Sequence, residues 1–232
     1  MPVISFASPK GGVGKTTAAL LLATELANKG VGVTVIDADP EHYIERWAKL
    51  PDKPANLHVF TAATEDTIID DIERAQEVTP FVIVDLEGTA NMLVAYTISQ
   101  SDLVIIPMQP SGLDAAGAAK GLKLVKLQEK NARRLIPHAV LFTRTKAAIR
   151  TRTFAAIQEQ LQQAKVPVFT TQLLEREVYR SLFDFGGTLE DLDSKDGYKI
   201  EDAIGNARNF AGEVIEMVKN TASPVNKQVE VA

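Results

Sequence analysis

Cysteine is absent from this chain of 232 residues, and histidine is scarce. The absence of cysteine excludes a disulfide framework, cysteine-based metal sites and a thiol nucleophile. The three histidines, His42, His58 and His138, are scattered along the sequence, which argues against a histidine-based metal cluster. Any functional site must therefore be sought among other residue types.

A long apolar run is also missing. No stretch approaches the roughly 20 residues needed to span a bilayer, and the first residues lack the charged region and apolar run of a signal peptide. We therefore expect a soluble, cytoplasmic protein. With 45% hydrophobic residues, the chain can form one sizeable domain with a well-buried core.

The formal net charge is −5, but the two signs are unevenly distributed. Residues 37–87 hold thirteen acidic and four basic side chains, whereas residues 120–152 hold ten basic side chains and one acid, Glu129. An acidic protein with one basic block can still bind a polyanion locally. The basic residues of that block are Lys120, Lys123, Lys126, Lys130, Arg133, Arg134, Arg144, Lys146, Arg150 and Arg152.

Apolar runs alternate with helical patterns along residues 1–219, which predicts a single α/β domain. The continuous apolar strands indicate a mostly parallel, twisted sheet with helices on both faces. Residues 220–232 are expected to form a disordered tail. The expected strands are 3–7, 31–36, 57–60, 81–86, 103–107, 139–143 and 166–170. The expected helices are 15–29, 41–50, 64–77, 114–134, 151–164, 177–185 and 200–219.

Ligands of such sheets lie at the carboxyl ends of the strands, and the first loop there reads G-G-V-G-K-T-T. Its glycines allow several backbone N–H groups to point at a phosphate chain, next to a helix N-terminus. Lys15 can reach the outer phosphates, and the Thr16 hydroxyl can hold Mg²⁺. The alternative is a glycine-rich turn that binds nothing. The expected nucleotide contacts are Gly11, Gly12, Val13, Gly14, Lys15, Thr16 and Thr17.

Pro9 stands where the usual phosphate-loop pattern has its first glycine, and Lys10 follows it. The resulting K-G-G-V-G-K-T-T resembles the deviant Walker A motif of the ParA/MinD ATPases, which implies a P-loop NTPase fold that binds ATP or ADP. The resemblance implies that Lys10 is the family's signature lysine, which reaches the nucleotide of a second ATP-bound subunit. A cation from the partner neutralises charge on the transferred phosphoryl group and couples hydrolysis to dimerisation. The alternative is a solvated loop lysine.

Two further loops supply acidic residues. The D-A-D-P run resembles a family element in which the second aspartate, here Asp39, orients the attacking water; Asp37 is expected to support Mg²⁺ or the loop. An Asp- and Pro-rich turn is the alternative.

The strand F-V-I-V-D ends at Asp85 and is typical of a Walker B segment, whose carboxylate holds Mg²⁺. The family commonly has a proline soon after it, but this chain has Glu87-Gly88, so Glu87 is either a switch residue or a surface acid.

Two later segments complete the expected nucleotide site. The stretch I-P-M-Q-P-S-G-L-D, residues 106–114, resembles a segment of small ParA proteins. This resemblance implies that Pro107 and Pro110 line the nucleotide site or the dimer interface. Arg144, which follows Thr143 at the end of a later strand, is expected near the adenine.

ParA-like proteins bind DNA without sequence preference, and the basic block fits that use. At 100° per residue, six basic side chains of the expected 114–134 helix fall within an arc of roughly 140°. Such a face can neutralise phosphates without reading bases, and a solvated helix face is the alternative. The six are Lys120, Lys123, Lys126, Lys130, Arg133 and Arg134. Further candidates are Lys146, Arg150, Arg152, Arg176, Arg180, Lys199 and Arg208.

The resemblance implies a slow Mg²⁺-dependent ATPase that forms an ATP-bound homodimer on the nucleoid and segregates or positions a plasmid or chromosome. A ParB-like protein or cargo adaptor would stimulate hydrolysis. D-A-D followed by Arg46-Trp47 is also similar to the ParA-like accessory protein of T-DNA transfer, so an adaptor in conjugative DNA processing is a second possibility. Positioning of a protein cargo is a third. MinD-like membrane binding is not expected, because residues 223–232, S-P-V-N-K-Q-V-E-V-A, are a poor candidate for a basic amphipathic helix.

Overall fold

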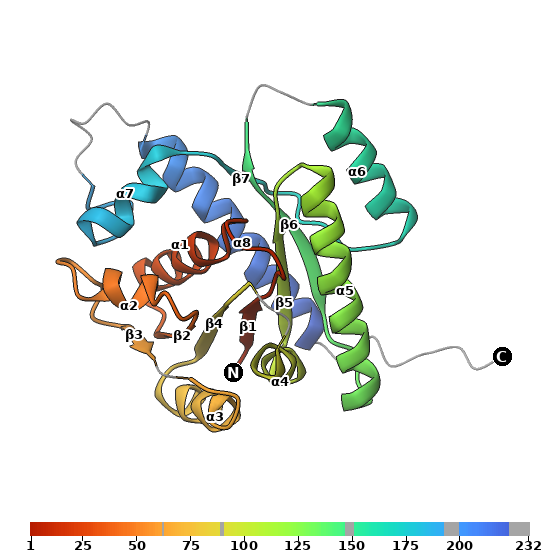
Figure 1. Cartoon of the computed structure of the whole chain (residues 1–232). Coiled ribbons are helices and arrows are strands. Elements are labelled where there is room, and N and C mark those ends of the chain that lie inside the picture. The colour runs from red at the N-terminus through yellow and green to blue at the C-terminus, as the bar shows by residue number, and fades with distance from the viewer. Residues whose placement is uncertain (62, 89–90, 147–150, 193–199, 223–232) are drawn as a thin grey trace.

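The structure, a computed structural model, describes residues 1–61, 63–88, 91–146, 151–192 and 200–222. Its seven strands form one sheet in the order β3-β2-β4-β1-β5-β6-β7, and all pairs are parallel (Figure 1). The expected α/β fold is confirmed. The strands are β1 (Val3–Phe6), β2 (Val33–Ala38), β3 (Leu57–Phe60), β4 (Phe81–Leu86), β5 (Leu103–Met108), β6 (His138–Thr145) and β7 (Leu173–Leu174).

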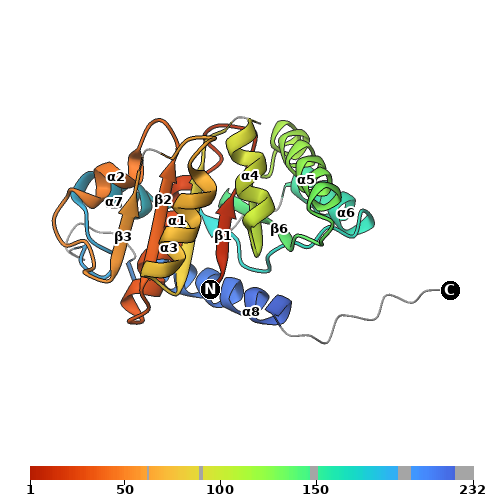
Figure 2. The same cartoon turned by 90° about the horizontal axis from the view of Figure 1, so that it is seen from below.

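Helices cover both faces of the sheet and bury two apolar layers (Figures 1 and 2). One face is covered by α1 (Lys15–Asn28), α2 (Tyr43–Ala48), α7 (Glu177–Phe185) and α8 (Ile200–Ala222). The other is covered by α3 (Ile68–Val78), α4 (Met92–Gln100), α5 (Gly112–Ala132) and α6 (Arg152–Gln163). Because both faces are buried, the central strands are apolar throughout, as parallel sheets require. No helix of the described residues is long and apolar enough to cross a membrane.

The strand order brings three sequence-distant loops together at one edge of the sheet. Strand β4 pairs with β1 on one side and with β2 on the other. Asp85 of β4 is in register with Phe6 of β1 and with Asp37 of β2. The loop after β1 therefore begins beside both aspartates, as the motifs predicted.

The expected strand at 166–170 is wrong. Val168 makes only an isolated bridge with Val140, and the last strand, β7, is the two-residue segment Leu173–Leu174. Pro167 explains the difference, because proline has no N–H to donate to a sheet ladder.

Helix α4 has no counterpart among the expected elements. Its sequence M-L-V-A-Y-T-I-S-Q is short and rich in β-branched and aromatic residues, so it gives little helical signal. The helix begins because the Asn91 side chain accepts a hydrogen bond from the Val94 N–H at 3.0 Å.

The start of α3 also differs from the expected start at Thr64. The helix begins at Ile68, because Thr64 belongs to a turn that precedes it.

Two helix ends differ from expectation. Helix α5 stops at Ala132, and Arg133 adopts a left-handed backbone with φ 52°. Arg133 and Arg134 therefore do not extend the basic helix face; Arg134 donates to the carbonyls of Ser99 and Ser101 at 2.6 and 2.8 Å. Helix α8 continues to Ala222, so the start of the expected tail is helical, and residues 223–232 lie outside the described part.

Candidate functional site

A cavity of about 670 Å³ opens at the carboxyl edge of the sheet. Its floor is the loop after β1, and its walls come from the ends of β2, β4 and β6 and from helices α2 and α7. The strand ends contribute Asp39, Gly88, Thr143 and Arg144. The predicted loop residues that line the cavity are Gly11, Gly12, Gly14, Lys15, Thr16 and Thr17.

The loop has the backbone of a phosphate cradle. Gly12 and Gly14 adopt φ values of 72° and 88°, which L side chains rarely tolerate. Helix α1 begins at Lys15, and Gly14 offers no side chain to cap it. The backbone N–H groups at this helix start are therefore available to an anion, and the helix dipole favours negative charge there.

Lys15 is 6% exposed and points its charge into an acidic surrounding. Burial lowers the pKa of its ammonium, while Asp85, Asp39 and Glu87 oppose that shift. A nearly buried cation at the start of a helix is well placed to bind phosphate oxygens, because the low dielectric strengthens charge interactions.

Asp85 and Asp37 are completely buried. Neither carboxylate oxygen of Asp85 has a hydrogen-bond partner among the described residues, and the same holds for Oδ1 of Asp37; Oδ2 of Asp37 accepts from the Glu45 N–H at 2.9 Å. Burial raises the pKa of Asp85 to about 8, and the nearby Thr16 hydroxyl, although it makes no hydrogen bond of good geometry to the carboxylate, opposes that shift only in part.

These orphaned oxygens fit a Mg²⁺ ion. The described residues contain no group of three or more His, Asp or Glu side chains that could hold a metal alone. Mg²⁺ sites of phosphate-binding proteins usually need only one or two carboxylates, because substrate phosphates and water complete the shell. Asp85 and Thr16 can supply the protein's part of the Mg²⁺ ligands, and Asp37 lies in register with Asp85 on the neighbouring strand.

The raised pKa of Asp85 makes a prediction about stability without nucleotide and Mg²⁺. The folded state keeps a proton that the unfolded chain loses near pH 4, so stability falls as the pH rises toward about 8. One such group contributes up to about 1.4 kcal/mol per pH unit. Asp85→Asn should flatten this decline in urea unfolding at pH 5 to 8. The exposed Asp66→Asn is the control, and parallel curves for Asp85→Asn and the parent would contradict the prediction.

Asp39 lies at the mouth of the same cavity. It is partly exposed, and its Oδ1 accepts from the Glu41 N–H at 3.0 Å, which closes a local turn. Thus the Asp–Pro turn exists, yet it leaves the carboxylate beside the phosphate loop. The water-orienting role of Asp39 stays a prediction.

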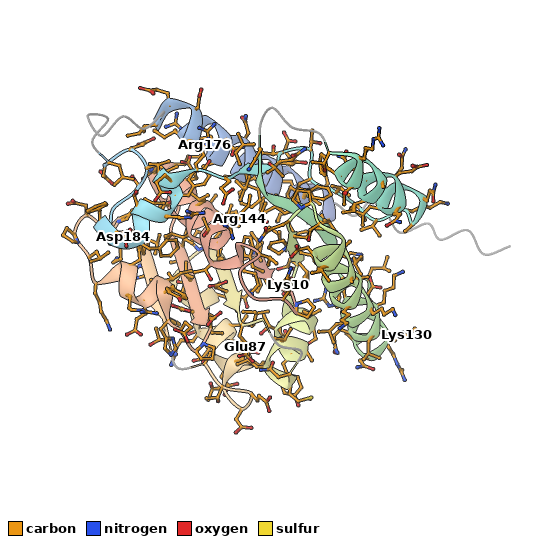
Figure 3. The ribbon with its side chains drawn as sticks, turned by 45° about the horizontal axis from the view of Figure 1, so that its top comes forward. Lys10, Glu87, Lys130, Arg144, Arg176 and Asp184 are labelled. Carbon is orange, nitrogen blue, oxygen red and sulfur yellow. The ribbon has the colours of Figure 1, made fainter. Side chains whose placement is uncertain are left out.

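Glu87 is half-buried and accepts a hydrogen bond from the side chain of Asn91, the residue that caps α4 (Figure 3). It also contributes to the electrostatic field at Lys15. The Glu87 side chain therefore connects the end of β4 with the start of α4.

Lys10 pairs within its own chain. Its Nζ lies 2.8 Å from Oδ1 of Asp114, a residue of the first turn of α5 that is 3% exposed. The side chain of Lys10 is itself 39% exposed. Lys10 is therefore not merely a solvated loop lysine, and it lies at the surface where a second subunit could approach.

Three other predicted contacts lie differently. Pro107 is buried inside β5, in register with Leu141 of β6, and does not line the cavity. Pro110 lies in the turn before α5, also outside the cavity lining. Arg144 does line the cavity, but its guanidinium pairs with Glu175 at 2.8 Å.

The predicted DNA-contact residues lie in different surroundings. Lys120, Lys123, Lys126 and Lys130 are exposed on one face of α5, and Lys130 lies near the C-terminal end of that helix (Figure 3). Arg152 is exposed at the start of α6, whereas Arg176 and Arg180 line the nucleotide cavity. Arg208 pairs with Glu25 and Glu190. Arg150 and Lys199 lie outside the described residues.

Sequence reasoning missed an aromatic wall of the cavity. Tyr43 of α2 and Phe183 of α7 stack edge to face with ring centroids 6.5 Å apart, and Tyr179 lies beside them in the lining. The strongly amphipathic pattern of α7 was the available signal, but the pattern alone does not tell which helix it meets.

Comparison with known proteins agrees with this geometry. The family model described as VirC1 protein matches residues 1–197. The ParA protein of Rhizobium radiobacter is 43% identical over 211 residues, which cover 91% of this chain and 95% of that protein. The maintenance of carboxysome distribution protein A of Halothiobacillus neapolitanus is 27% identical over 208 residues, covering 89% of this chain and 94% of that protein.

The fold has a close solved counterpart as well. A variant of McdA from Cyanothece, solved in complex with ATP, superposes with a TM-score of 0.69 and 19% identity. The match covers 95% of this chain and 96% of that one. The phosphate loop, the acidic loops and the parallel sheet thus agree with the family match, and the chain belongs to the VirC1/ParA family of MinD- and ParA-like ATPases.

Proposed function

We propose that the chain is a Mg²⁺-dependent ATPase switch that dimerises with ATP, binds DNA without sequence preference and thereby segregates or positions a cargo. One observation carries the proposal. The cavity lining joins a phosphate loop, the buried Lys15 and the partly exposed Asp39, and the orphaned Asp85 lies close enough to act electrostatically on Lys15. Binding, charge neutralisation and water activation are the three tasks that phosphoryl transfer to water requires.

Each residue has a separate task in the proposed reaction. The loop amides and Lys15 hold the phosphates, and Asp39 orients the attacking water. Asp85 and Thr16 are the residues that would hold Mg²⁺, which supplies charge neutralisation at the phosphates when bound. Turnover is slow in the isolated protein, because a switch depends on which nucleotide is bound.

Dimerisation gives Lys10 its proposed role. In the single chain its ammonium pairs with Asp114, so it must leave this partner to reach a nucleotide bound by a second copy. The transfer exchanges one anionic partner for another, and ATP offers more charge than one carboxylate. Nucleotide binding and assembly are thereby linked.

The proposal is tested by following the oligomeric state and phosphate release together. Purified protein freed of nucleotide should be monomeric, become dimeric with Mg²⁺ and ATP, and release phosphate slowly. Light scattering after size exclusion and a phosphate-release assay give the two readouts. A chain that binds ATP yet stays monomeric would contradict the switch.

The lysines of α5 support the DNA part of the proposal. Lys120, Lys123, Lys126 and Lys130 form no ion pair with any described residue. The neighbouring acid Glu129 is turned away, since its Oε1 accepts from the Ile136 N–H at 3.0 Å. Four unpaired cations on one helix face attract a phosphate backbone.

We expect ATP-dependent binding to random DNA that weakens steeply with salt. Replacing Lys123 and Lys130 by glutamine should reduce the slope of log K against log salt by about 0.9 for each DNA phosphate that is no longer neutralised. Fluorescence anisotropy with a random duplex at several salt concentrations measures this slope. Lys29→Gln, on an exposed turn after α1, is the control. An unchanged slope in the double variant would remove α5 from the DNA interface.

The cargo and partner are further parts of the proposal. The 43% identity to a ParA protein favours segregation of a plasmid or chromosome, assisted by a ParB-like protein on the nucleoid in the cytoplasm. The similarity to a protein named for carboxysome distribution supports a protein cargo as the second candidate, and the VirC1 family match supports a DNA-transfer adaptor as the third. A pull-down with protein that is held in its ATP-bound state, followed by identification of the bound protein, distinguishes the three candidate functions.

A further inference from the structure

Two carbonyl groups of the phosphate loop are held from outside by side chains at the ends of β5 and β6. The Gly12 carbonyl accepts from Gln109 Nε2 at 3.0 Å and from Arg144 Nη1 at 3.4 Å. The Val13 carbonyl accepts from the Thr143 hydroxyl at 2.6 Å. Three side chains therefore fix two consecutive peptide groups of the loop.

Fixing a carbonyl also fixes the next N–H group. A trans peptide is planar, so its C=O and N–H point in opposite directions, and no peptide of the described residues is cis. When Gly12 O and Val13 O point to β5 and β6, the N–H groups of Val13 and Gly14 point away from these strands. Neither N–H has a hydrogen-bond partner among the described residues, so both are free for an anion.

The end of β6 is deformed in a way that allows this contact. Successive residues of a regular strand point to opposite faces of the sheet, yet Thr143 and Arg144 both reach the same loop. Arg144 has a left-handed backbone with φ 51°, and the register between β6 and β7 shifts between Thr143 and Thr145. Such an irregularity redirects side chains next to functional sites.

Two further contacts complete the arrangement. Thr143 is 2% exposed, and a Cβ added to Gly14 would lie 3.6 Å from its Cβ, so the threonine packs directly under the loop. The guanidinium of Arg144 is held by Glu175, whose Oε1 also accepts from Arg180 of α7 at 2.8 Å. The cluster thus connects the phosphate loop with α7 across the cavity, and Arg144 at its centre is labelled in Figure 3.

We propose that Gln109, Thr143 and Arg144 are positioning residues that hold the phosphate loop in its anion-binding shape before nucleotide arrives. This inference rests on the proposed nucleotide site and assigns Arg144 to the loop rather than to the adenine. A preformed loop binds more tightly because less conformational freedom is lost on binding.

Replacing Arg144 by glycine gives the sharpest test, because a purely structural role and a positioning role predict different results. Glycine adopts φ 51° without strain, so the free energy of unfolding should stay equal or rise. The phosphate loop loses the hydrogen bond from Arg144 to the Gly12 carbonyl. The Kd for Mg²⁺·ADP, measured by titration calorimetry, should therefore increase about tenfold. Lys165→Gly is the matched control: Lys165 is exposed, has φ 53° and lies outside the cavity lining, so its affinity should not change.

The hydroxyl of Thr143 is tested by a second pair of variants. Thr143→Val keeps the shape and removes the donor, and its Kd for Mg²⁺·ADP should rise about tenfold, whereas Thr143→Ser should stay within roughly threefold of the parent. Equal affinity of Arg144→Gly, Thr143→Val and the parent would overturn the positioning role while leaving the nucleotide site intact. Failure of the parent itself to bind Mg²⁺·ADP would overturn both.

Discussion

Replacing Lys15 by alanine should abolish measurable binding of ATP and ADP. The ammonium is 6% exposed and stands at the first residue of α1, where the loop amides converge. A charge-assisted hydrogen bond to phosphate is roughly twice as strong as one between neutral groups. We expect a Kd for Mg²⁺·ATP at least roughly a hundredfold higher than that of the parent, measured by titration calorimetry.

Lys10→Ala is the matched control, because it removes a lysine from the same loop. Lys10 pairs with Asp114 and does not line the cavity of its own chain, so its loss should leave the nucleotide affinity of the monomer nearly unchanged. It should instead prevent ATP-dependent dimer formation. If Lys15→Ala retained its affinity, or if Lys10→Ala lost it to the same extent, the assignment of the two lysines would be wrong.

The parts of the site that sequence could predict are local. Every residue from Gly11 to Thr17 except the buried Val13 lines the cavity floor, because glycines and a following helix dictate the backbone of such a loop. Asp37 and Asp85 come together because each ends a buried strand, and the carboxyl ends of parallel strands meet at one edge. Neither inference needs knowledge of how distant helices pack.

The parts that sequence could not predict depend on distant contacts. Thr143 and Gln109 reach the phosphate loop from 130 and 97 residues away along the chain, and no local pattern marks such contacts. The left-handed backbone of Arg144 carries no signal either, because arginine is not a residue that favours it. Arg176 and Arg180 are a further example: the packing of α7 places them in the cavity lining, which their charge alone did not indicate, and their contact with DNA stays a prediction.

The Lys10–Asp114 pair explains why the two phosphate-loop lysines differ in environment. Asp114 is 3% exposed, and its other oxygen accepts from the hydroxyl of Ser111, the residue that caps α5. A buried carboxylate without a cation is costly, so Lys10 is held beside α5 until a stronger anionic partner is available. Lys15 needs no such movement, because the acids around it belong to the nucleotide site itself.

The second large effect is expected for Asp39→Ala, which should nearly abolish phosphate release while ATP binding persists. Asp39 lies at the cavity mouth and is partly exposed, so its removal creates no buried defect. Loss of a residue that orients the attacking water typically slows hydrolysis about a hundredfold or more. The binding groups, Lys15 and the loop amides, stay in place.

Such a variant should accumulate as the ATP-bound dimer, because assembly precedes hydrolysis in the proposed cycle. Light scattering after size exclusion with Mg²⁺ and ATP should show a dimer that persists far longer than that of the parent, while the phosphate-release assay stays near background. Glu41→Ala is the matched control: Glu41 also lines the cavity and takes part in the same turn through its N–H, which alanine keeps. A group needed only for hydrolysis affects neither assembly nor nucleotide affinity, so a monomeric Asp39→Ala protein would contradict the proposed role of this carboxylate. Hydrolysis of ATP at the parent's rate would likewise show that the carboxylate does not act on the attacking water.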